Sequence, residues 1–173
     1  FAKDTSEFDT LEELKKSIKE KLEEENKNKA KYETEDAAIK AVSDATEVEI
    51  PSGMIETEID NMVRDIETRL SYQGMKLDQY LEMMGKSMED FRKEYEEQAK
   101  TSVKTRLTLE AIEKAEKIEP SDEEVDKKLK EMAAMYGKKE DELALNEQFM
   151  NYIKDSLKGE AVIKFIVDNA KIK

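Results

Sequence analysis

The chain has 173 residues, of which 42% are charged and 38% hydrophobic, and its formal net charge is -13. This length fits one domain, and the acidity would repel nucleic acid and anionic membrane surfaces. The chain has no His and no Cys, which excludes disulfides, thiolate metal sites and most general-base and nucleophilic enzymes. We therefore expect no catalytic residue, no metal site and no cofactor. No stretch approaches the roughly 20 apolar residues of a membrane span.

The first predicted helix runs from Leu11 to Ala45. Thr10 and Glu13 match a capping box at its start, and apolar residues follow at positions 11, 14, 18 and 22. Its middle is polar on nearly every face, which is typical of a helix that bridges packed regions. We expect this helix to be long and exposed at its middle.

The next predicted helix begins at Pro51, a residue that favours the first position of a helix. Its apolar face continues to the breaker Gly74, and a short helix over 77–84 closes at Gly85. The apolar face consists of Ile55, Ile59, Met62, Val63, Ile66 and Leu70.

The stretch from Ser87 to Ile118 contains neither Gly nor Pro, and its apolar spacing predicts one continuous helix. Its apolar stripe is narrow before Gln98 and wide after Leu107. A narrow stripe suits a helix covered on one side, and a wide one a helix packed on several sides. We expect the C-terminal half to lie in a core and the N-terminal half to project from it.

After Pro120, Ser121 and Glu124 match a second capping box for a helix that ends at Gly137. A brief helical turn over 140–145 and a last helix capped by Asn146 complete the chain. No second strand is available to pair with residues 48–50. The pattern therefore predicts an all-α protein of long antiparallel helices.

Two local patterns resemble active-site chemistry. Glu56 and Asp60 share a helix face and could act as acid and base, but with 43 acidic residues such pairs arise by chance, so we favour a solvated face. Gly85-Lys86-Ser87 resembles the end of a phosphate-binding loop, but the Gly required five residues earlier is Tyr80. We interpret it as a helix boundary.

Methionine is frequent, with nine residues against 6% aromatics. Met fills irregular gaps in cores and also lines surfaces that accept many shapes. Met62 and Met150 fall in clear apolar stripes, which favours a core. Met83, Met84 and Met88 flank a Gly corner where three apolar side chains cannot all face one core, so a core and an adaptable binding surface stay equal alternatives there.

Four ordered segments resemble the C-terminal domain of bacterial trigger factor, a ribosome-associated chaperone. They are VEIPSGMIETEIDNMVRDIETRLSYQGM, LDQYLEMMGKSMEDFRKEYEEQAK, RLTLEAIEKAEKIEPSDEEVDKKLKEMAAMYG and AVIKFIVDNAKI. The resemblance implies an elongated helical body with two protruding arms that hold unfolded chains in the crevice between them. It implies a spine helix and linker over 1–50, a first arm over 51–118, and a second arm with a return to the body over 119–173.

The start EFDTLEELKKSI resembles the segment that follows the prolyl isomerase domain in this family. Neither that domain nor the ribosome-binding tail, with its basic Gly-Phe-Arg loop, has a counterpart here. The chain therefore looks like a fragment of a longer bacterial, cytoplasmic protein, and isomerisation and ribosome attachment are expected of that parent only.

The resemblance implies a holdase that works without ATP on nascent or unfolded polypeptides. The alternative is a helical adaptor that binds one folded partner; clustered Met with few aromatics favours the holdase, because single-partner interfaces concentrate Tyr, Trp and Arg. A homodimer stays open. The residues expected to contact clients are Met54, Ile55, Met75, Leu81, Met83, Met84, Met88, Phe91, Met132, Met135, Tyr136 and Phe149.

Overall fold

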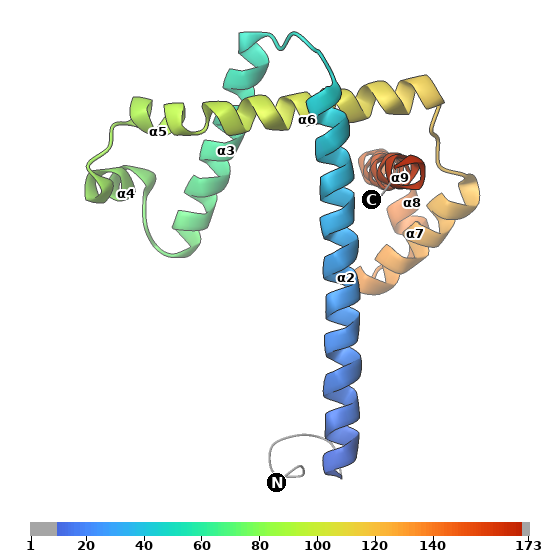
Figure 1. The fold of residues 1–173 in the computed structure, drawn as a ribbon. Coiled ribbons are helices and arrows are strands. Elements are labelled where there is room, and N and C mark those ends of the chain that lie inside the picture. Colours follow the sequence, from blue (N-terminus) through green and yellow to red (C-terminus); the bar gives the residue numbers. More distant parts are fainter. Residues whose placement is uncertain (1–9, 171–173) are drawn as a thin grey trace.

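The computed structural model describes residues 10–170, which form eight helices and no strand (Figure 1). This confirms the predicted all-α fold and its elongated shape with two arms. The helices are α2 (Leu11–Ala45), α3 (Ser52–Tyr72), α4 (Leu77–Met84), α5 (Met88–Glu94), α6 (Glu96–Glu116), α7 (Asp122–Tyr136), α8 (Glu140–Ala144) and α9 (Glu147–Asn169).

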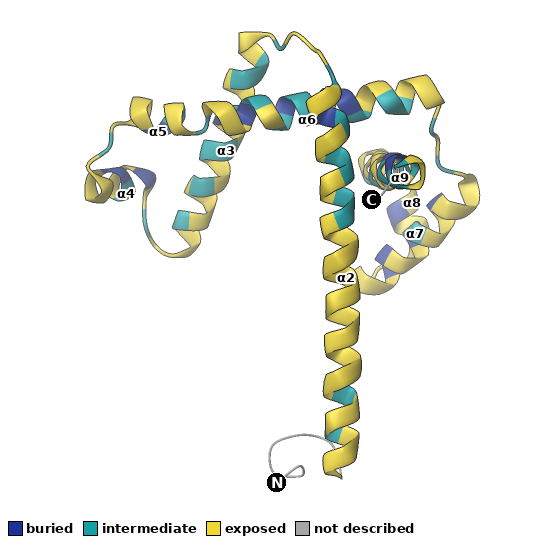
Figure 2. Ribbon diagram, in the orientation of Figure 1, coloured by how far each residue is buried: buried dark blue, intermediate teal, exposed yellow. Residues whose placement is uncertain are grey.

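Helix α2 is the long spine, and it begins and ends at the predicted residues. Thr10 caps it: the Glu13 backbone N–H donates to Thr10 Oγ1 at 3.2 Å, and the Thr10 N–H donates to Glu13 Oε2 at 3.1 Å. Its middle is exposed, as predicted, and its lower half extends away from the other helices (Figure 2). Within residues 10–170, its C-terminal part packs against α6 and α9.

Helix α6 is the hub of the fold, because it packs against α2, α3, α5 and α9. Its buried side chains at the crossings are small: Ala99, Val103 and Thr108. Side-chain size at a contact sets the distance between helix axes, so these residues allow close crossings. Side-chain hydrogen bonds join the same helices, from Ser102 Oγ to Glu58 on α3 at 2.7 Å and between Thr105 and Ser43 on α2 at 3.2 Å.

The predicted continuous helix from Ser87 to Ile118 is wrong, because it is interrupted at Tyr95. The Tyr95 N–H donates to the carbonyl of Arg92, three residues back, at 3.1 Å. In the short helix before the break, Phe91 clusters with Leu77 and Leu81 of α4, and the Arg92 guanidinium pairs with the carboxylates of Glu56 and Asp60 on α3. These contacts join segments distant in sequence, so the spacing of apolar residues along one helix cannot predict them.

The expected burial of the C-terminal half of α6 is also wrong. Burial is deepest in the middle, at Ala99, Val103 and Thr108, whereas Ala111 and Ala115 are exposed. The reason is geometric: α2, α3 and α9 cross α6 there. The helix also ends at Glu116 rather than at Ile118, since Lys117 takes a left-handed conformation with φ +52°.

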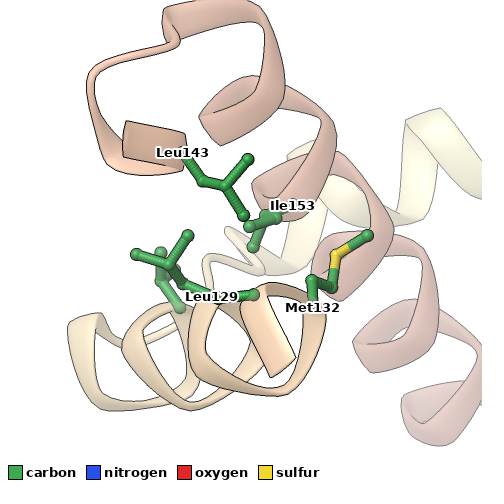
Figure 3. Close-up of a cluster of buried hydrophobic side chains, with 6 residues drawn as sticks. Leu129, Met132, Leu143 and Ile153 are labelled. Atoms are coloured by element: carbon green, nitrogen blue, oxygen red, sulfur yellow. The ribbon is translucent and has the colours of Figure 1, made fainter. Parts of the chain in front are cut away.

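Each arm has its own small hydrophobic core. The first arm, defined as α3 to α5, buries Leu77, Leu81 and Phe91. The second arm, defined as α7, α8 and the first half of α9, packs Leu129 and Met132 of α7 toward Leu143 of α8 and Ile153 of α9 (Figure 3). The two arms lie on opposite sides of α2 in the view of Figure 1, so neither core extends into the other.

Candidate functional site

The tip of the first arm carries three exposed methionines around one corner. Met83, Met84 and Met88 are 75%, 51% and 39% exposed. Gly85 makes the corner, ending α4 in a left-handed conformation with φ +64° that glycine adopts at no steric cost. Because α4 has eight residues and faces the arm's core with Leu77 and Leu81, its last two side chains project away. Of the two alternatives left open for these methionines, a core is therefore wrong, because all three are exposed.

Next to this corner lies an open hollow of about 720 Å³. Tyr72 at the end of α3 is on its rim and is 88% exposed. Met75, Leu77 and Met88 supply apolar wall, and Lys76 and Asp78 supply charge. The hollow extends the apolar area at the tip of the first arm from α4 back to α3.

Three residues expected at the surface are buried instead. Leu81 and Phe91 lie in the core of the first arm, and Met132 lies in the core of the second. Phe91 makes edge contacts with the rings of Tyr80 and Tyr95, with centroids 6.4 and 5.1 Å away. Helical spacing groups apolar residues on one face but does not say whether a second helix covers that face, which is why the sequence misplaces them.

Four further candidates are half-buried: Met54, Ile55, Met75 and Phe149. Met54 and Ile55 lie in the first turn of α3, away from the exposed corner of the first arm. Phe149 packs on the core of the second arm and touches the edge of the Tyr136 ring, with centroids 6.5 Å apart. These residues offer part of their apolar surface to solvent.

The tip of the second arm is a second exposed apolar area. Met135 and Tyr136, both expected there, are 71% and 57% exposed, at the point where Gly137 ends α7. The structure adds Leu145, between α8 and α9, and Tyr152, on α9, which are 87% and 60% exposed. Tyr152 directly precedes Ile153, the most buried residue of this arm, so its outward direction follows from helical geometry.

A second hollow, of about 430 Å³, lies between α6 and α9 at the base of the second arm. Its lining includes the apolar side chains of Leu109 and Val162 and the charged side chains of Arg106 and Asp155. Gly159 opens it, since a Cβ at this position would meet no atom within 4 Å. The apolar areas of the two arms are therefore distributed along them rather than gathered in one deep pocket.

The carboxylates of Glu56 and Asp60, the pair singled out in the sequence, both form ion pairs with Arg92. The Arg92 guanidinium donates to both, at 2.8 and 2.6 Å, which raises the pKa of Arg92. Residues 10–170 hold no group of three or more side chains placed to ligate a metal ion. Within the same residues, no helix combines the length and apolar character needed to cross a bilayer. The described residues therefore suit binding through exposed apolar side chains on charged helices.

Comparisons with known proteins agree with this architecture. Residues 10–168 match the family model described as bacterial trigger factor protein (TF) C-terminus. The chain is 47% identical over 174 residues to trigger factor of Clostridioides difficile and 44% identical over 176 residues to that of Pelotomaculum thermopropionicum, with 99% of this chain covered in both. It spans 41% and 40% of the length of these two relatives.

A solved structure of domains of trigger factor from Thermotoga maritima has the same fold. Its TM-score is 0.55 at 21% sequence identity, and the match covers 95% of this chain and 98% of that one. The family match over residues 10–168 and the identities above 40% are independent of this fold likeness. The chain belongs to the family of bacterial trigger factor C-termini.

Proposed function

We propose that this chain is a holdase: it binds hydrophobic segments of nascent or unfolded polypeptides, without ATP, at the apolar tips of its two arms. The observation that carries the proposal is the separation of the exposed methionines from the arm cores. Met83, Met84 and Met135 are each more than half exposed, although each lies beside a packed cluster that could have covered it. Large exposed apolar patches on a soluble protein mark interaction sites.

Methionine suits a surface that must accept many sequences. Its side chain has three rotatable bonds and a polarisable sulfur, so one surface can adapt to differently shaped apolar segments. The net charge of -13 supports the same use, because like charge keeps copies of an acidic protein apart while their apolar tips stay open.

The alternative function is a helical adaptor for one folded partner. Such interfaces usually concentrate Trp, Tyr and Arg in a central, tightly packed patch. Here the exposed apolar side chains of the arms are split between two tips, with Tyr72 on one and Tyr136 and Tyr152 on the other. This division favours several loose contacts along an extended client over a single packed interface.

The chain spans about two fifths of the length of its relatives, so activities of the whole protein are also proposals. Prolyl isomerisation and ribosome attachment are assigned to parts of a longer protein outside residues 1–173. The match to the C-terminus of the family supports this division. Action in the bacterial cytoplasm is part of the same proposal.

The test is suppression of aggregation of several unrelated unfolded proteins, with and without ATP. The variant M83Q/M84Q/M88Q should suppress aggregation less than the parent chain, at a similar melting temperature. Tyr32→Gln is the matched control, because Tyr32 is 64% exposed but lies on α2, away from both arms. Equal suppression by the triple variant and the control would refute a client site at the first arm. Suppression of one client only would favour the adaptor.

A further inference from the structure

The N-terminal half of α2 carries an apolar stripe that no other part of residues 10–170 covers. Leu11, Ile18 and Leu22 are 50%, 49% and 52% exposed, and Leu14 is half-buried. Spacings of three and four residues place all four on one face. Between Leu22 and Ala37 the only large apolar side chain is Tyr32, so the stripe is confined to about three helical turns.

The charges beside this stripe are positive, in contrast to the chain as a whole. Between Leu14 and Leu22 there are four lysines, at 15, 16, 19 and 21, and one acid, Glu20. In helical projection Lys15 and Lys21 lie about 60° to either side of Ile18, so they border the stripe. Lys16 and Lys19 point elsewhere and pair along the helix with Glu20 and Glu23, at 3.8 and 3.7 Å.

We propose that this face of α2, the stripe together with Lys15 and Lys21, docks an acidic amphipathic helix of a partner polypeptide. Apolar residues of the partner at helical spacing would cover Leu14 and Ile18, and its flanking Glu or Asp would meet the two lysines. This is the arrangement of apolar seams and flanking charges that pairs helices in coiled coils.

Acidic residues lie mostly away from this face. Of the six Glu over residues 11–25, all except Glu25 project more than about 100° from Ile18. The nearest part of α2 that packs on other helices begins near Thr34, about 18 Å beyond Leu22 at 1.5 Å per residue. That distance is about two Debye lengths at physiological ionic strength, so charges on the body are largely screened. Glu25 follows the stripe on the same face and sets its end.

Two other occupants fit less well. A second copy of this chain carries the same lysines, so like charges would meet across the seam. For any occupant, four half-exposed side chains offer on the order of 200 Å² of apolar surface, below the roughly 800 Å² per partner of a stable interface. A lipid surface would bury Glu25, which lies on the same face within one turn of Leu22, whereas a partner helix can end before it. The small area predicts a weak contact that depends on charge.

The test uses M83Q/M84Q/M88Q as the parent, so that binding at the tip of the first arm does not contribute. Hydrogen exchange separates binding on α2 from binding at the tip of the second arm, which keeps the outcome distinct from the proposed holdase function. The probe is a labelled synthetic helix with Leu at its a and d positions and Glu at e and g. Its counterpart has Lys at e and g. Fluorescence anisotropy at low ionic strength measures binding, and hydrogen exchange locates it.

We expect the Glu peptide to bind about tenfold more tightly than the Lys peptide and to protect residues 11–22. K15E/K21E should reverse this preference, and Ile18→Ser should weaken both peptides. K16E/K19E is the control that changes the same charge away from the stripe, and it should retain the preference.

Four results would each overturn the proposal. They are equal binding of the two peptides, no binding of either, protection confined to the arms, and a preference lost equally in K16E/K19E. Concentration-dependent dimerisation abolished by Ile18→Ser would assign the face to a second copy instead. Binding to phosphatidylglycerol vesicles with the same dependence on Ile18 would assign it to a membrane.

Discussion

Replacing Phe91 by Ala should unfold the tip of the first arm and leave the rest of the protein folded. Phe91 is 4% exposed and touches the rings of Tyr80 and Tyr95. Its burial contributes about 1.5–3 kcal/mol, and each edge contact adds about 0.5–1.5 kcal/mol. The expected loss is therefore about 3–5 kcal/mol, as measured for Phe→Ala in other cores.

That loss is large for this arm. Besides Ile59 on α3, only Leu77, Leu81 and Phe91 are buried in this arm. The three side chains of its core contribute about 5–9 kcal/mol before the cost of ordering the backbone. Hydrogen exchange should show protection lost over residues 75–94, while α9 and the middle of α6 keep theirs. Tyr72→Ala is the control, since Tyr72 is 88% exposed. Simultaneous loss of protection in α7 to α9 would refute the separation of the two arm cores.

Three further predictions concern local features. Gly159→Ala should raise the free energy of unfolding by about 0.5–1 kcal/mol, because the new Cβ would meet no atom within 4 Å. Gly137→Ala should lower the free energy of unfolding, because Gly137 has φ +63°. Denaturant titration measures both changes. Ser121→Ala should cost about 1 kcal/mol through loss of the α7 cap. Hydrogen bonds from Ser121 lower the pKa of Glu124, so in the wild type this cap stabilises at neutral pH and weakens as pH falls through that pKa, which circular dichroism during acid titration checks. Arg92→Gln should destabilise by less than about 1 kcal/mol in thermal melts, because its partners are more than half exposed.

Helix ends were the features most accessible from sequence. Thr10 and Ser121 cap their helices as predicted, and Gly85 and Gly137 end theirs in left-handed conformations. These signals are local, because a cap or a glycine acts within one turn of the chain. The all-α class and the exposed middle of α2 follow from equally local patterns.

Burial depended on contacts between distant segments and was predicted less well. Met132 and Met135 lie three residues apart on α7, yet one is 7% and the other 71% exposed. Which of them is covered depends on where α8 and α9 return, some ten to twenty residues later. The interruption at Tyr95 has the same origin, since it follows from contacts of α5 with α3 and α4.

The candidate site was likewise predictable from the sequence in part. The Gly corner with three methionines was accessible, because a helix of eight residues has too little facing surface to bury them all. Leu145 and Tyr152 were missed, although Tyr152 follows from its neighbour: once Ile153 is assigned to the core, the preceding residue points about 100° away along the helix.

The distribution of burial connects these features to the proposed function. A holdase must offer apolar surface to clients without offering it to other copies of itself, and small separate cores with acidic surroundings meet both requirements. Fusing the two arm cores would bury more area and stabilise the chain, but it would also cover Met135 and Tyr136. The low stability expected of each arm tip is therefore tied to the exposure of the same tips, and a variant that packs Met83 and Met84 against new apolar neighbours should gain stability as it loses client binding. Melting temperature and aggregation suppression that rise together in such a variant would contradict this reasoning.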